Sequence, residues 1–192
     1  MVKTYKNFID KNENDLLLNY CKNIDESIWG VLPESYNNNN FWDGRTIQSN
    51  QIFKDNKKIY NILNKYKNNL INNIKKDYKV LHELYNDTMS IVRWPVGYEL
   101  FPHADGEEPD GSEHPFPWRE YGCVIYLNDD FKGGEIYYPN LNLQPKIESR
   151  MAAAHQSNIK CLHGVKPVTE GMRYTIGFFV TSNINYALKY GK

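Results

Sequence analysis

The sequence predicts an α+β fold that is mainly β, in which N-terminal helices support a double-layered sheet. Three observations lead to this prediction. Residues 1–87 are rich in Asn and Lys and place apolar side chains at helical spacing. After residue 87, short segments rich in β-branched and aromatic residues alternate with Gly, Pro and Asn/Asp turns. The chain has 192 residues, of which 41% are hydrophobic, and shows no internal repeat, so we expect one packed domain.

Two amphipathic helices are expected in the N-terminal part. Residues 12–24 begin with an Asn/Asp capping signal, and residues 58–81 repeat the pattern over a longer stretch. Their apolar stripes are Leu16, Leu17, Tyr20, Cys21 and Ile24 in the first, and Ile59, Ile62, Leu63, Tyr66, Leu70, Ile74 and Tyr78 in the second. The lysines between Lys54 and Lys79 fit the solvated face of a helix better than a nucleic-acid surface, because the net charge of the chain is zero.

The strands are expected in the second half of the chain. The candidate segments are residues 88–95, 121–128, 134–139, 146–156, 160–168 and 172–182. Six or more short strands after two helices favour a double-sheet β fold with the helices packed outside. The turn at residues 169–171 predicts that the last two segments pair as a hairpin, which would bring Arg173 beside the strand that carries His163.

Composition excludes several classes of protein. The three cysteines are Cys21, Cys123 and Cys161, which lie far apart and lack C-x-x-C spacing, so free thiols in a reducing cytoplasm are the simplest expectation. The N-terminus has no signal-peptide pattern, and no segment approaches the ~20 apolar residues of a membrane span. We therefore expect a cytoplasmic protein with no membrane partner and, given its zero net charge, no nucleic-acid partner.

A candidate metal site begins at residues 100–106, "LFPHADG". If residues 101–105 are extended, His103 and Asp105 project from the same face, because side chains alternate along a strand. A third ligand is needed, and His163 is the strongest candidate because it lies on a predicted strand before a turn and a second strand. By contrast, His114 lies in a Pro-flanked loop, and His155 is interpreted as a core residue or a support for the ligands.

Arg173 adds a second element to this candidate site. Arginine stays charged and grips a carboxylate with two parallel hydrogen bonds. Two imidazoles and one carboxylate that leave coordination positions open form the facial triad of non-haem Fe(II) oxygenases. A buried arginine beside such a triad suggests that a carboxylate-bearing molecule binds next to the metal.

These motifs resemble one enzyme family. "HAD" at residues 103–105, then His163 and Arg173, within "GCVIYLNDDFKGGEIYYP" and "LHGVKPVTEGMRYTIGFF", are similar to the 2-oxoglutarate-dependent Fe(II) oxygenases and to their prolyl-4-hydroxylase-like branch. The resemblance covers roughly Asp87 to Ser182. It implies a double-stranded β-helix, or jelly roll, with N-terminal supporting helices. The expected organisation is one dioxygenase domain over residues 1–192, with helical support at 1–87 and the jelly-roll core at 88–182.

The resemblance also implies roles for individual residues. His103, Asp105 and His163 would ligate Fe(II) and form the catalytic centre. Arg173 would hold the distal carboxylate of 2-oxoglutarate, with Tyr126 and Thr175 as further cosubstrate-binding residues. The implied cofactors are Fe(II), with 2-oxoglutarate and O₂ as cosubstrates and ascorbate as a reductant.

The function implied is hydroxylation of an unactivated C–H bond, with a prolyl residue of a protein or peptide as the expected target and succinate and CO₂ as by-products. Asp105 disfavours halogenation, because halogenases of this superfamily lack the carboxylate ligand. Two alternatives stay open. A nucleic-acid demethylase of the same superfamily usually has a second arginine where this chain has Phe179. A non-catalytic metal-binding jelly-roll sensor would have no evident use for Arg173.

Three features depart from the family pattern or fall outside it. Trp94 stands where these hydroxylases usually have a tyrosine, and Ala152–Ala154 replace larger side chains. The acidic, Pro-rich segment 106–120 follows the metal motif directly, where a substrate-covering loop would lie. These differences affect the expected substrate more than the expected chemistry.

Overall fold

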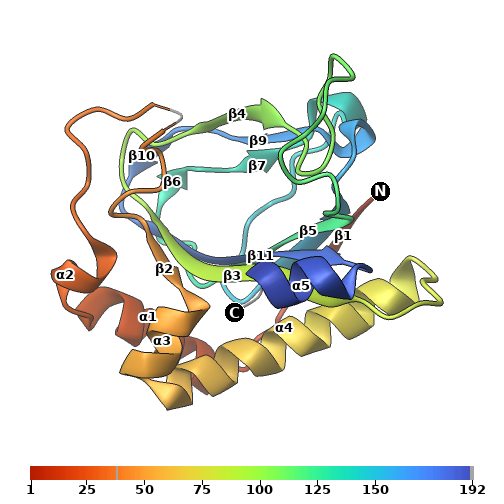
Figure 1. Ribbon diagram of the computed structural model, residues 1–192. Helices are drawn as coiled ribbons and strands as arrows, with labels where there is room; N and C mark the ends of the chain where they lie inside the picture. The colour runs from red at the N-terminus through yellow and green to blue at the C-terminus, as the bar shows by residue number, and fades with distance from the viewer. Residues whose placement is uncertain (38, 191–192) are drawn as a thin grey trace.

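The computed structural model describes residues 1–37 and 39–190, and consists of two facing β-sheets with helices packed on the outside of the larger one (Figure 1). The helices are α1 (Lys11–Asn23), α2 (Glu26–Trp29), α3 (Ser49–Asp55), α4 (Lys57–Asp77) and α5 (Ile184–Tyr190). The strands are β1 (Val2–Tyr5), β2 (Thr46–Gln48), β3 (Tyr85–Trp94), β4 (Leu100–His103), β5 (Tyr121–Tyr126), β6 (Lys132–Gly133), β7 (Ile136–Tyr137), β8 (Ala152–Gln156), β9 (His163–Val165), β10 (Val168–Glu170) and β11 (Arg173–Thr181).

The sheets are antiparallel throughout the described residues. The larger sheet has the strand order β1-β8-β5-β11-β3-β2, a three-stranded sheet has the order β4-β9-β7, and β10 pairs with β6. The three-stranded sheet lies opposite the larger one, and α1, α3 and α4 lie on the larger sheet's outer side (Figure 1). This arrangement is the predicted mainly-β jelly roll with supporting helices, so the prediction of the fold class is confirmed.

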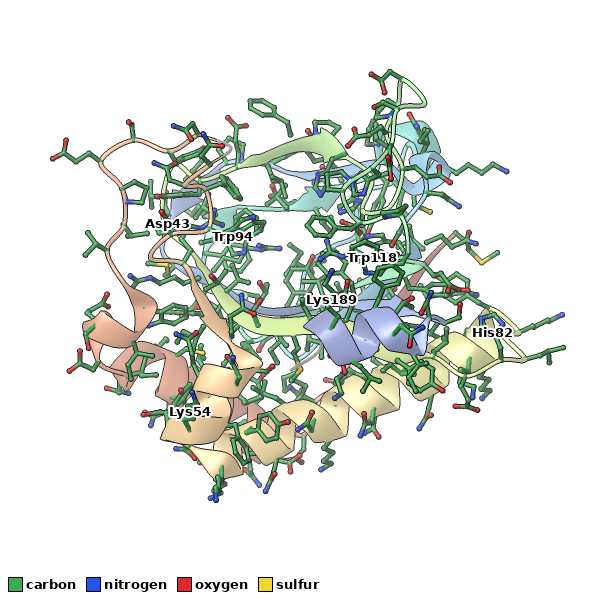
Figure 2. All side chains as sticks on the ribbon, in the orientation of Figure 1. Asp43, Lys54, His82, Trp94, Trp118 and Lys189 are labelled. Carbon is green, nitrogen blue, oxygen red and sulfur yellow. The ribbon has the colours of Figure 1, made fainter. Side chains whose placement is uncertain are left out.

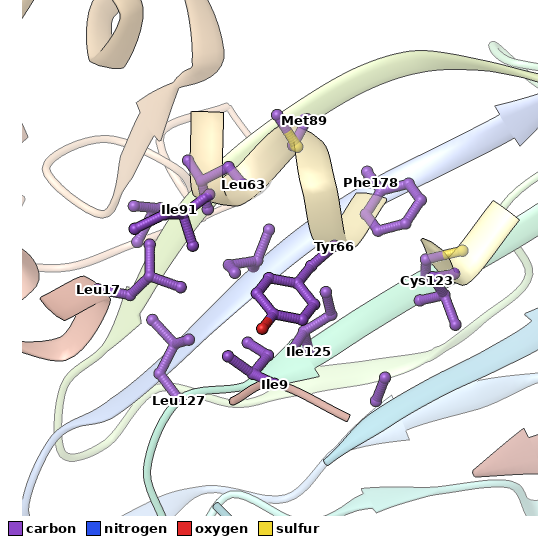
Figure 3. Packing of buried hydrophobic residues seen from close by; sticks show 14 of the residues in the cluster. Ile9, Leu17, Leu63, Tyr66, Met89, Ile91, Cys123, Ile125, Leu127 and Phe178 are labelled. Atoms are coloured by element: carbon purple, nitrogen blue, oxygen red, sulfur yellow. The ribbon is translucent and has the colours of Figure 1, made fainter. Parts of the chain in front are cut away.

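Helix α4 is the main support of the larger sheet. It begins at an N-cap, Asn56, whose side chain accepts a hydrogen bond from the backbone N–H of Ile59. Its buried residues recur every three or four positions: Ile59, Ile62, Leu63, Tyr66, Leu70, Ile71 and Ile74. Figure 3 shows Leu63 and Tyr66 of this stripe packed with side chains of the sheet such as Ile125 and Phe178. Each large apolar side chain buried in this way contributes about 1.5–3 kcal/mol, so this core fixes the sheet on which the site is built.

Alternation along β11 separates the core from the site. Tyr174, Ile176, Phe178 and Val180 point toward the helices and belong to the main apolar core. The alternate residues, Arg173, Thr175, Gly177 and Phe179, line a cavity between the two sheets. Because successive side chains point to opposite faces of a strand, β11 can pack apolar side chains into the core on one face and present polar side chains to the cavity on the other.

The predicted hairpin between the last two strands is wrong. Strand β9 pairs with β4 and β7, β10 pairs with β6, and β11 pairs with β3 and β5. Pro167 has no backbone N–H to donate to a ladder, and it separates β9 from β10. The chain leaves the three-stranded sheet at this point, pairs with β6 through β10, and joins the larger sheet at β11. Arg173 therefore reaches the site from the sheet opposite His163, and not from a neighbouring strand.

No helix in the described part of the chain is both long and apolar enough to cross a membrane.

Candidate active site

The candidate site is a small cavity of about 130 Å³ between the two sheets. All three predicted metal ligands and Arg173 line it. Larger hollows of about 320 and 590 Å³ lie on the surface, away from these side chains. Within residues 1–37 and 39–190, the one group of His, Cys, Asp or Glu side chains arranged to hold a metal ion is His103, Asp105 and His163.

The three predicted ligands converge from the smaller sheet. His103 ends β4 and His163 begins β9, and the two residues are paired in register across these strands. Asp105 lies in a bend beyond the end of β4, so the expected extended segment stops two residues early. The bend still turns its carboxylate toward the histidines: Asp105 Oδ1 lies 3.6 Å from His103 Nε2 and 3.8 Å from His163 Nε2. The three ligand atoms lie within 4.8 Å of one another.

Backbone carbonyls fix the tautomer of both histidines. His103 Nδ1 is 2.9 Å from the carbonyl oxygen of Phe101, and His163 Nδ1 is 3.1 Å from that of Cys161. A carbonyl oxygen can only accept, so each Nδ1 carries a hydrogen, and in the neutral imidazole each Nε2 keeps a lone pair. Both lone pairs belong to the atoms that face Asp105, which is the arrangement that metal binding needs.

The charges of the site agree with this donor set. Burial, together with the nearby His155, lowers the pKa of His163 to about 3, so this imidazole is neutral at physiological pH. Burial alone would raise the pKa of Asp105, but the surrounding histidines hold it well below its usual value. Burial opposes protonation of His103, but hydrogen bonding to Asp105 raises its pKa. At physiological pH the site therefore contains a neutral imidazole on His163 and an ionised carboxylate on Asp105. Neutral imidazoles with a carboxylate are the donors that Fe(II) prefers in oxygenases.

The opposite wall holds Arg173, which forms no ion pair with an acidic side chain in the part of the chain that the structure describes. Its side chain is 1% exposed, and its guanidinium carbon lies 4.7 Å from the ring centre of Trp94 and 5.1 Å from that of Tyr126. Arg173 Nε and Nη1, and the hydroxyl of Tyr126, have no hydrogen-bond partner among the residues that the structure describes. Buried polar groups in folded proteins are almost always hydrogen-bonded, so three unpaired ones at one place indicate a ligand with acceptor oxygens.

Tyr126 and Thr175 lie next to Arg173 in the structure. The two residues are paired in register on β5 and β11, and Thr175 is two positions from Arg173 on the same face. Thr175 Oγ1 accepts a hydrogen bond of 3.3 Å from Trp94 Nε1. Burial raises the pKa of Tyr126 while the charge of Arg173 opposes the shift, so the hydroxyl is protonated and able to donate. Arginine, two hydroxyls and an indole thus form a polar corner that fits a carboxylate.

Comparison with known proteins agrees with this geometry. Residues 89–181 match the model of the 2OG-Fe(II) oxygenase superfamily. This region is a 2OG-Fe(II) oxygenase domain. The predicted resemblance to these dioxygenases is confirmed, and so are the predicted Fe(II) and 2-oxoglutarate, which give the family its name.

Among curated proteins, the chain is similar to prolyl 3-hydroxylases. Prolyl 3-hydroxylase 1 of Gallus gallus is 32% identical over 71 residues, which is 34% of this chain and 10% of the relative. Prolyl 3-hydroxylase 3 of Homo sapiens is 33% identical over 91 residues, which is 41% of this chain and 12% of the relative. The matched segments therefore span about a tenth of the length of these relatives.

Solved structures share the fold. A prolyl hydroxylase of Trichoplax adhaerens, in complex with a peptide fragment of the hypoxia inducible factor oxygen degradation domain, has a TM-score of 0.71 and 20% identity over 97% of this chain and 86% of its own. A viral collagen prolyl hydroxylase from Paramecium Bursaria Chlorella virus-1, in complex with 2-oxoglutarate, has a TM-score of 0.62 and 16% identity over 94% of both chains.

The oxygenase domain also contains one site residue that sequence reasoning left undecided. His155 is 3% exposed, and its Nε2 lies 3.0 Å from Asp105 Oδ2 while its Nδ1 lies 3.0 Å from the hydroxyl of Tyr138. It lies on β8, opposite Gly122 of β5. Alternation along β8 could have placed His155 on the cavity side, but the sequence does not reveal which residue it meets there.

Trp94 of the oxygenase domain occupies the cavity wall. Figure 2 shows it between the two sheets, and its ring is 5% exposed. The guanidinium carbon of Arg45 lies 4.2 Å from the Trp94 ring centre, so this ring contacts both Arg45 and Arg173. Arg45 donates to the carbonyl oxygens of Phe41 and Arg93, which fastens the preceding loop to β3. Trp94 therefore contributes a flat apolar surface beside Arg173, and its N–H is taken up by Thr175 Oγ1.

The segment 106–120 is anchored near both ends. Glu107 accepts a 2.9 Å hydrogen bond from the backbone N–H of Ile159. Near the other end, Arg119 forms a 3.0 Å ion pair with the fully buried Asp87, and Trp118 stacks on Tyr186 of α5 at 4.0 Å between ring centres. The part between these anchors is mostly exposed. A substrate-covering role for this middle part stays a prediction.

Proposed function

We propose that this chain is a 2-oxoglutarate- and Fe(II)-dependent dioxygenase that hydroxylates an unactivated C–H bond of a protein or peptide, with a prolyl residue as its target. The observation that carries the proposal is a single cavity with two complementary walls. His103, Asp105 and His163 lie on one wall, and Arg173, which has unpaired buried N–H groups, lies on the other. A metal-binding site alone would not need a buried cation facing it.

In this proposal His103 and His163 hold Fe(II) through their Nε2 atoms and Asp105 holds it through a carboxylate oxygen. Arg173 binds the distal carboxylate of 2-oxoglutarate, and the hydroxyls of Tyr126 and Thr175 add hydrogen bonds. Fe(II), 2-oxoglutarate and O₂ together supply the oxidising power, and succinate and CO₂ are released. The chain's own contribution is to bind, to orient and to exclude water.

Water exclusion follows from the rest of the cavity lining. Val92, Leu100, Ile136 and Val165 surround the polar groups, and all but Leu100 are at most 6% exposed. In such an apolar enclosure the attraction between Arg173 and a carboxylate is much stronger than in water. Exclusion of water also protects a reactive oxidant from side reactions.

A protein or peptide substrate is supported by two kinds of observation. The similar curated proteins are named prolyl 3-hydroxylases, and the Trichoplax adhaerens structure is of a prolyl hydroxylase in complex with a peptide. At the cavity of this chain, Trp42 is a lining residue whose side chain is 45% exposed. A half-exposed indole offers a flat apolar face on which a pyrrolidine ring can pack.

The nucleic-acid demethylase alternative is less well supported by this site. Phe179 lines the cavity where repair-type members usually have a second arginine. The guanidinium of Arg119 lies 3.6 Å from the Phe179 ring centre, but its charge is matched by the buried Asp87. A non-catalytic sensor is less well supported because it gives no role to the unpaired Arg173. A reducing compartment such as the cytoplasm is supported by Cys21, Cys123 and Cys161, all buried and free.

The proposal is tested by turnover with a panel of peptides that contain or lack proline. The purified protein is supplied with Fe(II), 2-oxoglutarate, O₂ and ascorbate, and succinate release is compared with the appearance of a peptide that has gained one oxygen atom. We expect both products from wild type with at least one proline-containing peptide, and neither from Asp105→Ala. Absence of 2-oxoglutarate binding to the anaerobic Fe(II) protein would contradict the dioxygenase assignment. Hydroxylation confined to proline-free substrates would contradict only the prolyl target.

A further inference from the structure

His155 lies against the carboxylate of the candidate metal site, although it is not one of the three ligands. Its Nε2 is 3.0 Å from Asp105 Oδ2, and its Nδ1 is 3.0 Å from the hydroxyl of Tyr138. Tyr138 is fully buried and His155 nearly so, which leaves little access for water to replace either contact. Both side chains point into the space between the sheets, where their rings also approach that of His163.

The direction of each hydrogen bond follows from the chemistry of the groups. An ionised carboxylate can only accept, so His155 Nε2 carries a hydrogen and donates it to Asp105 Oδ2. In the neutral imidazole, Nδ1 is then an acceptor, and the hydroxyl of Tyr138 donates to it. Tyr138, His155 and Asp105 thus form one chain of hydrogen bonds that ends on a single carboxylate oxygen.

This chain makes the two oxygens of Asp105 different. Oδ2 is engaged by His155, whereas Oδ1 is the oxygen nearer to His103 Nε2 and His163 Nε2, at 3.6 and 3.8 Å. Rotation of the carboxylate would break a buried hydrogen bond, and leaving buried polar groups unpaired is costly. Asp105 is therefore held with one oxygen toward the metal position.

Gly122 provides independent support, because the contact between His155 and Asp105 occupies the space that a side chain at residue 122 would fill. Gly122 lies between His155 of β8 and Phe179 of β11 in the larger sheet. A Cβ atom at this position would lie 2.3 Å from Asp105 Oδ2 and 2.5 Å from His155 Nε2. Any residue other than glycine would therefore separate the histidine from the carboxylate.

We propose that His155, oriented by Tyr138, is a positioning residue that restricts Asp105 to binding the metal through Oδ1 alone. The proposal rests on the proposed function, in which Asp105 is a metal ligand. A carboxylate that offers one oxygen uses one coordination position and leaves the others for 2-oxoglutarate and O₂. Groups that orient metal ligands typically change metal affinity by about 10- to 100-fold when removed.

The test uses Co(II), whose visible absorption reports the number and geometry of its ligands, in place of Fe(II). His155→Leu removes the donor, His155→Gln keeps an N–H donor at a similar reach, and Tyr138→Phe removes only the orienting hydroxyl. We expect Co(II) to bind His155→Leu about 10- to 100-fold more weakly than wild type, with an altered visible spectrum. His155→Gln should recover most of the affinity and the wild-type spectrum, and Tyr138→Phe should fall between them. His82→Leu, an exposed histidine far from the cavity (Figure 2), is the matched control and should bind as wild type does.

Each outcome decides the proposal. Wild-type affinity and spectrum in His155→Leu would overturn it and leave the proposed function intact. Failure of the wild-type protein to bind Co(II) would overturn both. If His155→Leu does not fold, as judged by its thermal melt, the other two variants decide. A Tyr138→Phe protein with wild-type Co(II) affinity and spectrum would then overturn the proposal, and a weakened Tyr138→Phe beside a near-normal His155→Gln would support it.

Discussion

Replacing Arg173 is expected to separate cosubstrate binding from folding. The guanidinium is buried against Trp94 and Tyr126, and its Nε and Nη1 have no hydrogen-bond partner among the described residues. In the free protein this charge is therefore compensated only by the two aromatic rings, and under the proposed function the carboxylate of 2-oxoglutarate would supply the missing hydrogen-bond partner. Arg173→Met keeps most of the apolar stem and removes the charge.

The two expected magnitudes differ greatly. Removing one partner of a buried, hydrogen-bonded charge pair costs about 3–5 kcal/mol. At about 1.4 kcal/mol per factor of ten, 2-oxoglutarate should bind Arg173→Met between roughly a hundredfold and a few thousandfold more weakly. In the free protein, removal of two unpaired buried N–H groups relieves about 1–3 kcal/mol each. Loss of the two ring contacts costs about 0.5–2 kcal/mol each. The free variant should therefore lie between about 2 kcal/mol less stable and about 5 kcal/mol more stable than wild type.

The assay has two arms. Titration of 2-oxoglutarate into the anaerobic Fe(II) protein, followed by the charge-transfer absorbance of the chelate, gives the cosubstrate affinity. Urea unfolding of the metal-free protein gives the free energy of unfolding. Arg173→Lys should show intermediate affinity, because an ammonium group keeps the charge but loses the planar fork. Fe(II) affinity should be unchanged in both variants, because Arg173 is not among the three metal ligands.

Two results would refute this reasoning in different ways. Wild-type affinity of Arg173→Met for 2-oxoglutarate would show that another group binds the distal carboxylate. A free energy of unfolding several kcal/mol below wild type, in the metal-free protein, would show that Arg173 is compensated in the free state and holds the fold together.

Three further predictions concern Asp105, Gly122 and the cysteines. Asp105→Ala should abolish Fe(II) binding and 2-oxoglutarate turnover in a protein that stays folded but loses about 1–3 kcal/mol of stability, because the buried His155 N–H loses its acceptor. Full activity of this variant would remove Asp105 from the metal site. Gly122→Ala should lower the free energy of urea unfolding by about 1–3 kcal/mol and weaken Fe(II) binding, because its Cβ would lie 2.3 Å from the carboxylate of Asp105. Unchanged stability and affinity would argue against this packing. Burial raises the pKa of Cys21 to about 12, and all three cysteines are buried, so a colorimetric thiol reagent should label the native protein slowly and the unfolded protein fully. Rapid labelling of the native protein would contradict this arrangement.

A final prediction concerns residues 106–120. Amide hydrogen exchange should be fast in the exposed middle of this segment and slower near Arg119, where the ion pair with Asp87 anchors it. If the segment covers the substrate, the fast amides should become protected when substrate is added. Equal protection with and without substrate would count against a gating role.

Several features of this protein were determined by local sequence alone. The stripe that includes Ile59, Leu63 and Leu70 has helical periodicity, and α4 buries those residues as expected. Residues two positions apart on an extended strand lie on the same face, so Arg173 and Thr175 of β11 could be assigned to one face without a structure. The candidate metal donors His103, Asp105 and His163 could be selected from the sequence because their types, order and spacing fit a chemistry that few other residues can perform.

Tertiary structure decided which strands are neighbours and hence which side chains meet. Periodicity shows the face on which a side chain lies but not the strand that pairs beside it, so the expected hairpin of β9 and β11 was wrong and Arg173 came from the opposite sheet. The same limit applies to His155, which lies 50 positions from Asp105 in the chain. Their contact exists because β8 pairs with β5 at Gly122, where the absent side chain leaves room for both groups. Pairing between strands that are distant in the chain depends on the packing of the whole sheet. It therefore cannot be predicted from the hydrophobic pattern of one segment.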